Sequence, residues 1–388
     1  MIRQEGNIRL KKAISFEGFI TLIIIFAFFF YLSYEMNGAV NMFKTMMNTA
    51  YQLLITSVFE IMAIAVVAGA FAAVISEFGV VSIINKGLAI LMKPLYGLPG
   101  AASLGILTTY LSDNPAILTL AKDKGFRKYF KRYQLPALTN LGTCFGMGLI
   151  VTTFMISLGT KDNSLVKAAI IGNIGAVIGG IISVRFMLFF TKRYYGSEAL
   201  DSLAEGSSYD IMNYREVRKG SFIERLLDSM LEGGKSGVEL GFAIIPGVLI
   251  ICTAVMMLTK GPGPDGFTGE AYQGIALIPE LASYIDFIIQ PLFGFKTPDA
   301  IAFPITAIGA VGAAITLVPD MLANQLISAN DIAVFTAMGM CWSGYLSTHV
   351  AMMDGLNARK LTTKAILSHT IGGLVAGISA HFIFLLFS

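Results

Sequence analysis

The stretch Lys93-Pro94-Leu95-Tyr96-Gly97 returns 197 residues later as Gln290-Pro291-Leu292-Phe293-Gly294. The same spacing continues without gaps for almost a hundred residues. It pairs Thr119 with Thr316, Asp123 with Asp320, Thr139 with Thr336, Gly142 with Gly339, Cys144 with Cys341, Lys167 with Lys364, Gly175 with Gly372 and Gly180 with Gly377. Because glycines, cysteines and a proline keep one register across three apolar segments, we predict a duplicated structural unit.

A second, weaker register extends the repeat upstream. A spacing of 179 residues pairs Ser57 with Ser236 and Glu60 with Glu239, provided that the loop around Gly261–Gly274 is an insertion in the second copy. Each copy then holds five apolar segments, an odd number, so the two copies enter a membrane in opposite directions. Inverted repeats of this kind are typical of transporters that expose one site alternately to the two sides of a membrane.

The composition requires a membrane environment. The chain has 388 residues, of which 55% are hydrophobic and only 14% charged, and its mean hydropathy is +0.70. Apolar segments of about 20 residues, the length that crosses a bilayer, separate the charged stretches. We therefore predict an all-α integral membrane protein with about 10–11 transmembrane or re-entrant helices in two inverted repeats, broken at the midplane. Hydropathy does not distinguish full crossings from re-entrant hairpins at 79–97 and 101–121.

The predicted organisation has four parts. They are an N-terminal segment with the first transmembrane helix (1–48), a first repeat (49–190), a cytoplasmic linker (191–237) and a second, inverted repeat (238–388). The apolar run from Phe16 to Tyr34 is too long for a signal peptide and is interpreted as a retained helix. Within the linker, Ser221–Leu231 is predicted to form a short amphipathic helix at the membrane surface.

Charge predicts orientation and argues against a nucleic-acid partner. Basic residues concentrate in two loops, at 122–132 and 192–225, which we place in the cytoplasm by the positive-inside rule. The N-terminus is then cytoplasmic and the C-terminus external, in a bacterial cytoplasmic membrane. The net charge of +3 comes largely from these loops, so it concerns orientation and not nucleic-acid binding. Cys144, Cys252 and Cys341 lie in apolar segments and are expected to be free thiols.

Three stretches resemble the gate-domain membrane proteins, the group that includes nucleoside-recognition proteins and spore maturation proteins A and B. They are Lys93-Pro94-Leu95-Tyr96-Gly97, Leu111-Ser112-Asp113-Asn114-Pro115-Ala116, and Leu138-Thr139-Asn140-Leu141-Gly142 followed by Leu149-Ile150-Val151-Thr152-Thr153. The resemblance spans roughly 55–190, and the second copy more loosely. It implies a fold akin to the concentrative nucleoside transporters. The sequence departs from the spore-protein pattern at Asp113-Asn114-Pro115, so no particular ligand is carried over.

Asp113-Asn114-Pro115 is the strongest candidate site. Pro115 lacks an amide donor and disfavours the helical conformation at Asn114, so a helix should break here and leave backbone groups unpaired. Inside a membrane such groups occur only where they line a cavity or are buried in protein. Asp113 would bind a cation, a proton or a substrate hydroxyl. The alternative is a structural kink in which Asp113 caps the next helix.

Comparison of the copies adds further candidates, because several polar residues occur in one copy only. The candidate substrate-binding residues are Asp113, Asn114, Thr109, Asn140, Thr143, Thr306 and His349, and the candidate ion-coupling residues are Glu60, Glu239 and Asp113. Each has a structural alternative. The threonines and Asn140 would also serve as hydrogen bonds between helices, His349 as a buried core histidine, and the glutamates as partners of helix-break amides. Random divergence would also produce the asymmetry.

We interpret the chain as a secondary transporter of a small polar organic solute, nucleoside-like, coupled to H⁺ or Na⁺. It has no ATP-binding motif, and no set of residues for catalysis can be assembled, so we expect neither an enzyme nor a resident cofactor or metal. The expected partners are the lipid bilayer and the solute, with a homo-oligomer left open. One alternative is a divalent metal-ion permease using the paired Cys144 and Cys341. The other is a non-transporting membrane scaffold.

Overall fold

The computed structural model describes residues 12–113, 116–161, 164–197, 210 and 212–388, and it is helical through almost all of them. Six helices in this described part are long and apolar enough to cross a membrane. They are Phe16–Glu35, Ala39–Glu77, Ala137–Ser157, Val166–Tyr195, Phe222–Thr259 and Arg359–Phe387. The predicted all-α membrane architecture is therefore confirmed, and several of the remaining apolar segments form shorter, paired helices.

The N-terminal region consists of one isolated helix and one long composite helix. Helix α1 (Phe16–Glu35) starts at the Ser15 cap and is exposed along almost its whole length. Only its end packs, through Leu32 and Met36, against α2 (Ala39–Gln52) and the second repeat. Helix α2 continues through the π-helical turn η1 (Leu53–Val58) into α3 (Phe59–Glu77). The predicted boundary between residues 48 and 49 thus falls inside a continuous helix.

The rest of the first repeat is a series of short helices followed by one long helix. In chain order its elements are α4 (Val80–Leu91), the π-helical turn η2 (Met92–Tyr96), α5 (Ala102–Leu111), α6 (Ala116–Lys122), α7 (Lys124–Arg127), α8 (Ala137–Thr143), α9 (Gly148–Ser157) and α10 (Val166–Tyr195). The second repeat has the same order of long, short and long helices. Its elements are α11 (Phe222–Gly247), η3 (Val248–Cys252), α12 (Thr253–Thr259), α13 (Leu277–Ser283), α14 (Asp286–Phe293), η4 (Pro298–Ile301), α15 (Ala302–Gly309), α16 (Val311–Ala314), η5 (Ile315–Leu317), α17 (Val318–Ala323), α18 (Ala329–Cys341), α19 (Tyr345–Gly355), η6 (Arg359–Leu361) and α20 (Thr362–Phe387).

Backbone geometry reproduces the spacing of 197 residues. Gly97 ends the first proline-containing segment with φ 71°, and its counterpart Gly294 ends the second with φ 63°. Between α8 and α9 the chain is interrupted at Met147, with φ 55°, and between α18 and α19 at the counterpart Gly344, with φ 59°. These left-handed residues stop a helix at equivalent places in the two copies, which confirms the duplicated unit.

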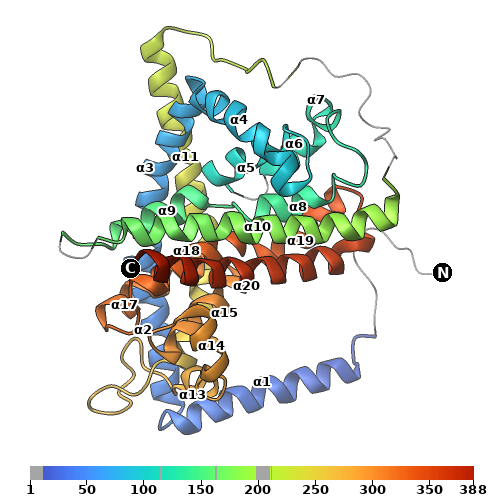
Figure 1. Ribbon diagram of the computed structural model, residues 1–388. Coiled ribbons are helices and arrows are strands. Elements are labelled where there is room, and N and C mark those ends of the chain that lie inside the picture. Colours follow the sequence, from blue (N-terminus) through green and yellow to red (C-terminus); the bar gives the residue numbers. More distant parts are fainter. Residues whose placement is uncertain (1–11, 114–115, 162–163, 198–209, 211) are drawn as a thin grey trace.

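Equivalent long helices run antiparallel and pack closely at glycines. Helix α10 lies along α20, and α3 lies along α11, with the chain direction reversed in each pair (Figure 1). A side chain on Gly175 of α10 would meet the Ala376 carbonyl of α20 at 2.7 Å. A side chain on Gly69 of α3 would meet the Gly233 carbonyl of α11 at 2.5 Å. Small residues therefore let both pairs approach to backbone contact, as is common between membrane helices.

The segment at 101–121 forms a helical hairpin. Helix α5 has 10 residues and α6 has 7, so each is too short to cross a bilayer core of about 30 Å. Ile117 of α6 is buried against Gly105 of α5 and Gly142 of α8, and a side chain on Gly105 would meet it at 2.9 Å. In the second copy, α15 and α16 form the equivalent hairpin, which turns at the extended residue Ala310.

The start of α11 differs from the predicted linker boundary. Residues 191–237 were assigned to the linker, whereas α10 continues to Tyr195 and α11 begins at Phe222. Ser221 and Glu224 form a capping box, in which each side chain accepts a hydrogen bond from the other residue's amide. The predicted surface helix at 221–231 is therefore the first part of a helix that runs continuously to Thr259.

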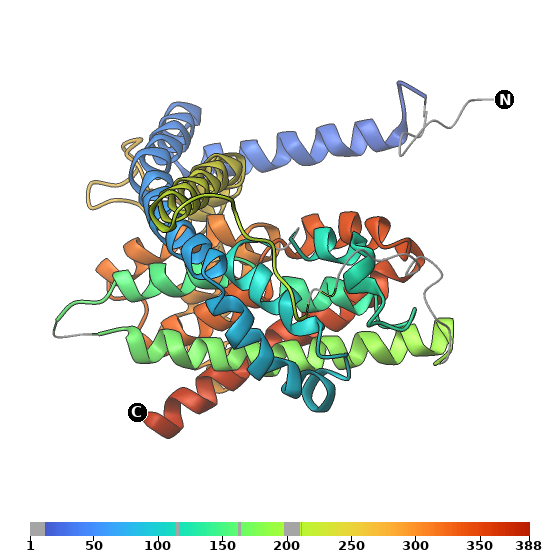
Figure 2. The same cartoon turned by 90° about the horizontal axis from the view of Figure 1, so that it is seen from above.

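The ends of the chain lie on opposite sides of the molecule. The beginning of α1 and the end of α10 lie on one side, and the end of α20 lies on the other, in both views (Figures 1 and 2). Helix α7, in the first basic segment, lies near the end of α10.

Candidate functional site

A cavity separates the α3–α11 pair from the tip of the first hairpin. Its volume is about 480 Å³, within the range of small-molecule sites. Helices α3 and α11 form one wall, where Gly69, Gly233 and Gly237 expose backbone. The end of α5 and the break after it form the opposite wall, with contributions from Val81 and Ile150. The cavity therefore lies between the α3–α11 pair, to which both repeats contribute, and the hairpin of the first repeat.

The polar groups of this cavity come from both walls, and Ser76 of α3 is one of them. Thr108, Ser112 and Asp113 line it from one side, and Ser236 and Glu239 of α11 from the other. The hydroxyls of Thr108 and Ser112 donate to the carbonyls one turn earlier, each at 2.7 Å, so their oxygens remain able to accept. Two carboxylates and no lysine or arginine belong to its described lining, which favours hydroxyl-bearing or cationic guests.

Asp113 occupies the position predicted from the sequence. Helix α5 ends at Leu111, and Ser112 leaves helical geometry with φ −133° and ψ −107°. Asp113 follows directly, and α6 begins at Ala116. The predicted partners in the motif, Asn114 and Pro115, lie outside the described residues. The carboxylate therefore stands at a helix break that borders a cavity, as the transporter interpretation requires.

The two candidate glutamates are exposed, and only one borders the cavity. Neither the Glu60 nor the Glu239 side chain is buried in the protein. Glu239 lines the edge of the cavity, and its side chain is 68% exposed. Its carboxylate oxygen lies 4.0 Å from the ammonium nitrogen of Lys235, one helical turn earlier. Glu60 lies on the outer surface of α3 and is not among the lining residues. Glu60 and Glu239 correspond in the spacing of 179 residues, but their structural surroundings differ.

Asn140 and Thr143 lie in the protein core instead of the cavity. The Asn140 amide donates to the Ser183 hydroxyl and to the Ala365 carbonyl, each at 3.0 Å, and so connects α8 to α10 and α20. Thr143 donates to the Thr139 carbonyl within its own helix at 2.7 Å. Both are fully buried. The structure does not bring Asn140 and Asp113 together in one cavity.

The remaining candidates are also buried and bonded locally. Thr109 donates to Gly105 at 2.8 Å, and Thr306 donates to Ala302 at 2.7 Å, in both cases one helical turn back. His349 contacts the Tyr345 carbonyl through Nδ1 at 2.8 Å, while its Nε2 has no partner in the structure. The threonines match the structural alternative considered for them, and His349 keeps one unused nitrogen.

A buried polar cluster between the repeats was missed by the site prediction. His369 of α20 lies 2.9 Å from the Ser183 hydroxyl and 3.8 Å from the Cys144 sulfur, and its ring is 4.7 Å from that of His349. The cluster lies where α8, α10 and α20 meet. In the spacing of 197 residues His369 corresponds to Gly172, and nothing in the sequence indicates that Ser183 faces this histidine.

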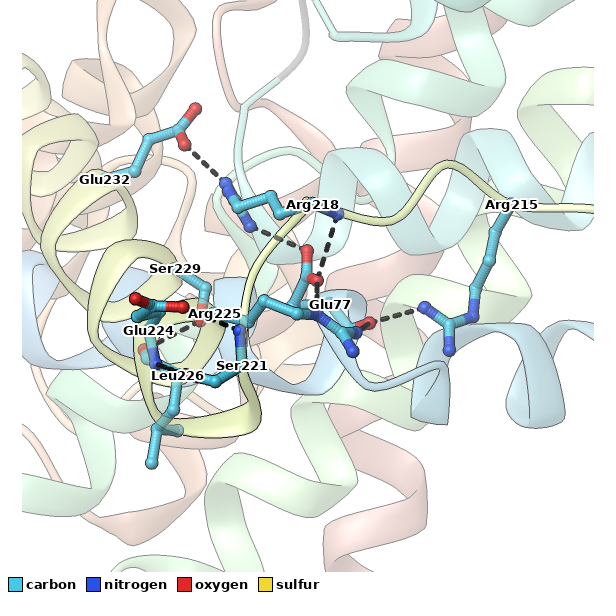
Figure 3. A network of polar contacts seen from close by, with 9 residues as sticks. All are labelled: Glu77, Arg215, Arg218, Ser221, Glu224, Arg225, Leu226, Ser229 and Glu232. Carbon is cyan, nitrogen blue, oxygen red and sulfur yellow. Dashed lines mark hydrogen bonds and ion pairs between the residues drawn. The ribbon is translucent and has the colours of Figure 1, made fainter.

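The linker is fastened beside the cavity by an ionic network. Glu77, at the end of α3, accepts from Arg218 at 2.8 Å and from Arg225 at 2.7 Å, and its backbone carbonyl accepts from Arg215 (Figure 3). Arg218 also pairs with Glu232 of α11. A smaller hollow of about 310 Å³ next to this network shares Ala73, Ser76, Gly233 and Ser236 with the main cavity. The described linker therefore covers one end of the cavity.

The other attachment of the linker is a hydrogen bond between Asp210 and the Tyr129 hydroxyl. This bond, with those from Asn213 and the Met212 amide, lowers the pKa of Asp210 below its ordinary value. Desolvation and the neighbouring carboxylate raise the pKa of Tyr129 to about 12. Asp210 thus remains ionised and Tyr129 remains neutral through the physiological range.

Comparison with protein-family models gives no match, and comparison with curated proteins gives none either. Solved structures do match. A doubly substituted CNTnw in an outward-facing state aligns over 85% of this chain and 77% of that one, with a TM-score of 0.54 and 13% identity. CNTnw in an inward-facing substrate-bound state aligns over 83% and 74%, with a TM-score of 0.52 and 14% identity. A singly substituted CNTnw in an intermediate state aligns over 84% and 76%, also with a TM-score of 0.52 and 14% identity. The chain therefore has the fold of these concentrative nucleoside transporter structures.

Proposed function

We propose that this protein is a secondary transporter that carries a small polar, nucleoside-like solute across the bacterial cytoplasmic membrane, coupled to H⁺ or Na⁺. The observation that carries the proposal is the cavity of about 480 Å³ between the α3–α11 pair and the hairpin break at Ser112 and Asp113. Helix breaks at the interface of inverted repeats are where transporters of this architecture hold substrates and coupling ions.

The fold supports movement as well as binding. The similar CNTnw structures are described as outward-facing, intermediate and inward-facing substrate-bound. The cavity lies between two groups of helices, the α3–α11 pair and the hairpin side. A shift of one group against the other would open it to either side of the membrane.

The lining suits a guest with a flat apolar part and several hydroxyls. Ala65, Ala72 and Leu240 supply apolar walls, and the hairpin supplies Thr108, Ser112 and Asp113 as hydrogen-bond partners. Glu239 at the edge would attract a cation or proton. Because Asp113 and Glu239 share one cavity, we assign ion coupling to these two carboxylates in preference to Glu60.

Several finer features belong to the same proposal. The first basic segment, around α7, lies on the side where α1 begins, which supports a cytoplasmic N-terminus. The motifs at 93–97, 111–116 and 138–153 support membership of the gate-domain family. A homo-oligomer is supported by α1, whose apolar side chains are exposed along most of the helix.

The metal-permease alternative has less support. Cys144 and Cys341 are both fully buried in the core between the repeats, away from the cavity lining. The Cys341 thiol is directed at the Ala176 carbonyl at 3.7 Å, and Cys144 lies beside His369. Buried thiols in such positions behave as small apolar groups.

Uptake into proteoliposomes tests the proposal. Purified protein would be supplied with labelled nucleosides, amino acids or divalent metals under an imposed Na⁺ or proton gradient. We expect gradient-dependent nucleoside uptake that is lost in Asp113→Asn. The matched control is Asp123→Asn, because Asp123 lies outside the cavity lining, where it accepts from the Phe126 amide at 2.9 Å.

Three results would overturn the proposal in different ways. Absence of nucleoside uptake under either gradient would remove the transporter assignment, and uptake of metals alone would favour the permease. Equal uptake by Asp113→Asn and Asp123→Asn would show that the Asp113 carboxylate takes no part in transport. Folding of each variant would be checked through the single tryptophan, Trp342, which is 3% exposed.

A further inference from the structure

A second cavity, of about 380 Å³, lies between the α4–η2 segment, α5 and α10. Its lining is almost entirely apolar, with Met92, Leu95, Ile106 and Phe145 among the side chains that form it. The few polar groups present are engaged with the protein. The Tyr96 hydroxyl donates to the Val177 carbonyl at 3.4 Å, for example. The cavity therefore offers hydrocarbon surface and little else to a guest.

The mouth of this cavity faces the apolar exterior of the protein. Leu91, Ile174 and Val177 line the cavity, and they are also 45%, 44% and 37% exposed. Exposed apolar side chains continue around them, at Ile90 and Ile170. In a membrane protein such a surface contacts lipid chains, so the guest most readily available is an acyl chain of the bilayer.

The rim carries positive charge. Arg185 of α10 donates through Nε to the Leu95 carbonyl at 2.8 Å and also to the Pro94 carbonyl, which places its guanidinium at the edge of the lining. Lys93, two residues before Leu95, is exposed. The sequences 80–111 and 166–195 contain no aspartate or glutamate, so the elements that frame the cavity do not neutralise these cations.

Further basic residues lie beyond this rim, toward the end of α10. Gln134 donates to the Gly97 carbonyl at 3.0 Å, at the end of η2, and so ties the basic segment 127–132 to this region. Arg132 of that segment lies over the Tyr195 ring at 5.1 Å, near the end of α10. The cation that directly contacts the lining segment is therefore Arg185, and the exposed Lys93 lies on that same segment.

We propose that this cavity binds an anionic phospholipid of the surrounding bilayer, with one acyl chain inside and the phosphate at Lys93 and Arg185. An apolar cavity alone would accept the chain of any lipid. The uncompensated cations at its rim select a headgroup with net negative charge, as basic pockets between membrane helices do. The inference stands independently of the solute that the protein carries.

Native mass spectrometry of the purified protein tests the site. Phosphatidylglycerol and phosphatidylcholine with identical acyl chains would be titrated onto delipidated protein. We expect phosphatidylglycerol to bind about thirtyfold more tightly, since each basic residue contributes about fivefold. Lys93→Gln with Arg185→Gln should abolish this preference. Val177→Phe, which fills the cavity mouth, should weaken the binding of both lipids.

Lys44→Gln is the matched control, because Lys44 is an exposed lysine of α2, which contributes no residue to the cavity lining. It should retain the full preference, which excludes a general effect of charge. Equal binding of the two lipids by the unmodified protein would overturn the proposal. So would an unchanged preference in Lys93→Gln with Arg185→Gln, or unchanged binding in Val177→Phe. If Arg185→Gln does not fold, Lys93→Gln alone still tests the proposal, because Lys93 is exposed. It should lower the preference for phosphatidylglycerol about fivefold.

Discussion

The contact between α3 and α11 should fail if a single methyl group is added at Gly237. A Cβ atom there would lie 2.5 Å from the Ala65 carbonyl oxygen, and the three nearest atoms all belong to the backbone of α3. Ordinary van der Waals contact begins near 3.4 Å. The two helices would have to separate by about 1 Å, because a backbone cannot rotate away as a side chain can.

The expected loss can be estimated from this separation. Overpacking of a close contact typically costs about 1–3 kcal/mol. Gly87 of α4 provides the matched control, because nothing lies within 4 Å of a Cβ atom at that helical position. Gly87→Ala should be neutral or stabilise the protein by up to about 1 kcal/mol through helix propensity. The two alanine variants should therefore differ by about 1–4 kcal/mol in unfolding free energy.

The assay is denaturant unfolding in detergent micelles, followed by the fluorescence of Trp342. This residue is 3% exposed and packs against Gly373 of α20, so its emission reports on the core and not on the mutated contact. Gly237→Ala should shift the midpoint to lower denaturant, and Gly87→Ala should not. Equal midpoints for the two variants would refute the account of the α3–α11 contact and of the cavity wall that it forms.

The remaining predictions concern the core, the ion site and the linker. Asn140→Ala should destabilise the protein by about 1–3 kcal/mol, because it leaves buried partners unsatisfied; an unchanged unfolding midpoint would contradict this. Glu239→Gln should alter the cation dependence of uptake whereas Glu60→Gln should not, since only the former lines the cavity; equal effects would reject the assignment. Because the pKa of Asp210 is lowered below 3.8, its contribution to linker attachment is present above about pH 4 and is lost only as pH falls further. A spin label in the linker should thus show constant mobility from about pH 5 to 9, where Tyr129 also stays protonated, and release within that range would disprove the contact.

The duplicated architecture was predictable because its signals are local. A glycine in left-handed geometry is required at Gly97 and again at Gly294, so the sequence retains both. Met147 shows the limit of this approach. It adopts the same left-handed geometry as its counterpart Gly344, yet no feature of methionine indicates a helix interruption.

The hairpin and the helix boundaries depended on contacts that hydropathy does not encode. The segment at 101–121 is apolar enough to cross a membrane, and only the packing of Ile117 into Gly105 and Gly142 shows that it turns back. Helix α11 begins early because Ser221 and Glu224 cap it, a local signal that the polarity of the surrounding linker obscured.

The site was predictable at the hairpin and not in the core. Asp113 stands beside a helix break that proline chemistry predicts, and it lines the cavity. Thr109 and Thr306 look equally suitable in sequence, but both use their hydroxyls within their own helix. Thr108, one position earlier than Thr109, faces the cavity instead. The direction in which a helix presents each residue depends on its neighbours, and hydropathy in a uniformly apolar segment does not reveal it.

Alternating access to the cavity can be tested by asking whether the hairpin break is reached from both sides of the membrane. The native thiols Cys144, Cys252 and Cys341 are buried, so a cysteine introduced as Ser112→Cys would be the reactive one among the described residues. It would be treated with a membrane-impermeant thiol reagent from either side of sealed vesicles. We expect labelling from both sides, at a rate that a transported solute lowers. Labelling from one side only, unaffected by any solute, would contradict alternating access to this cavity.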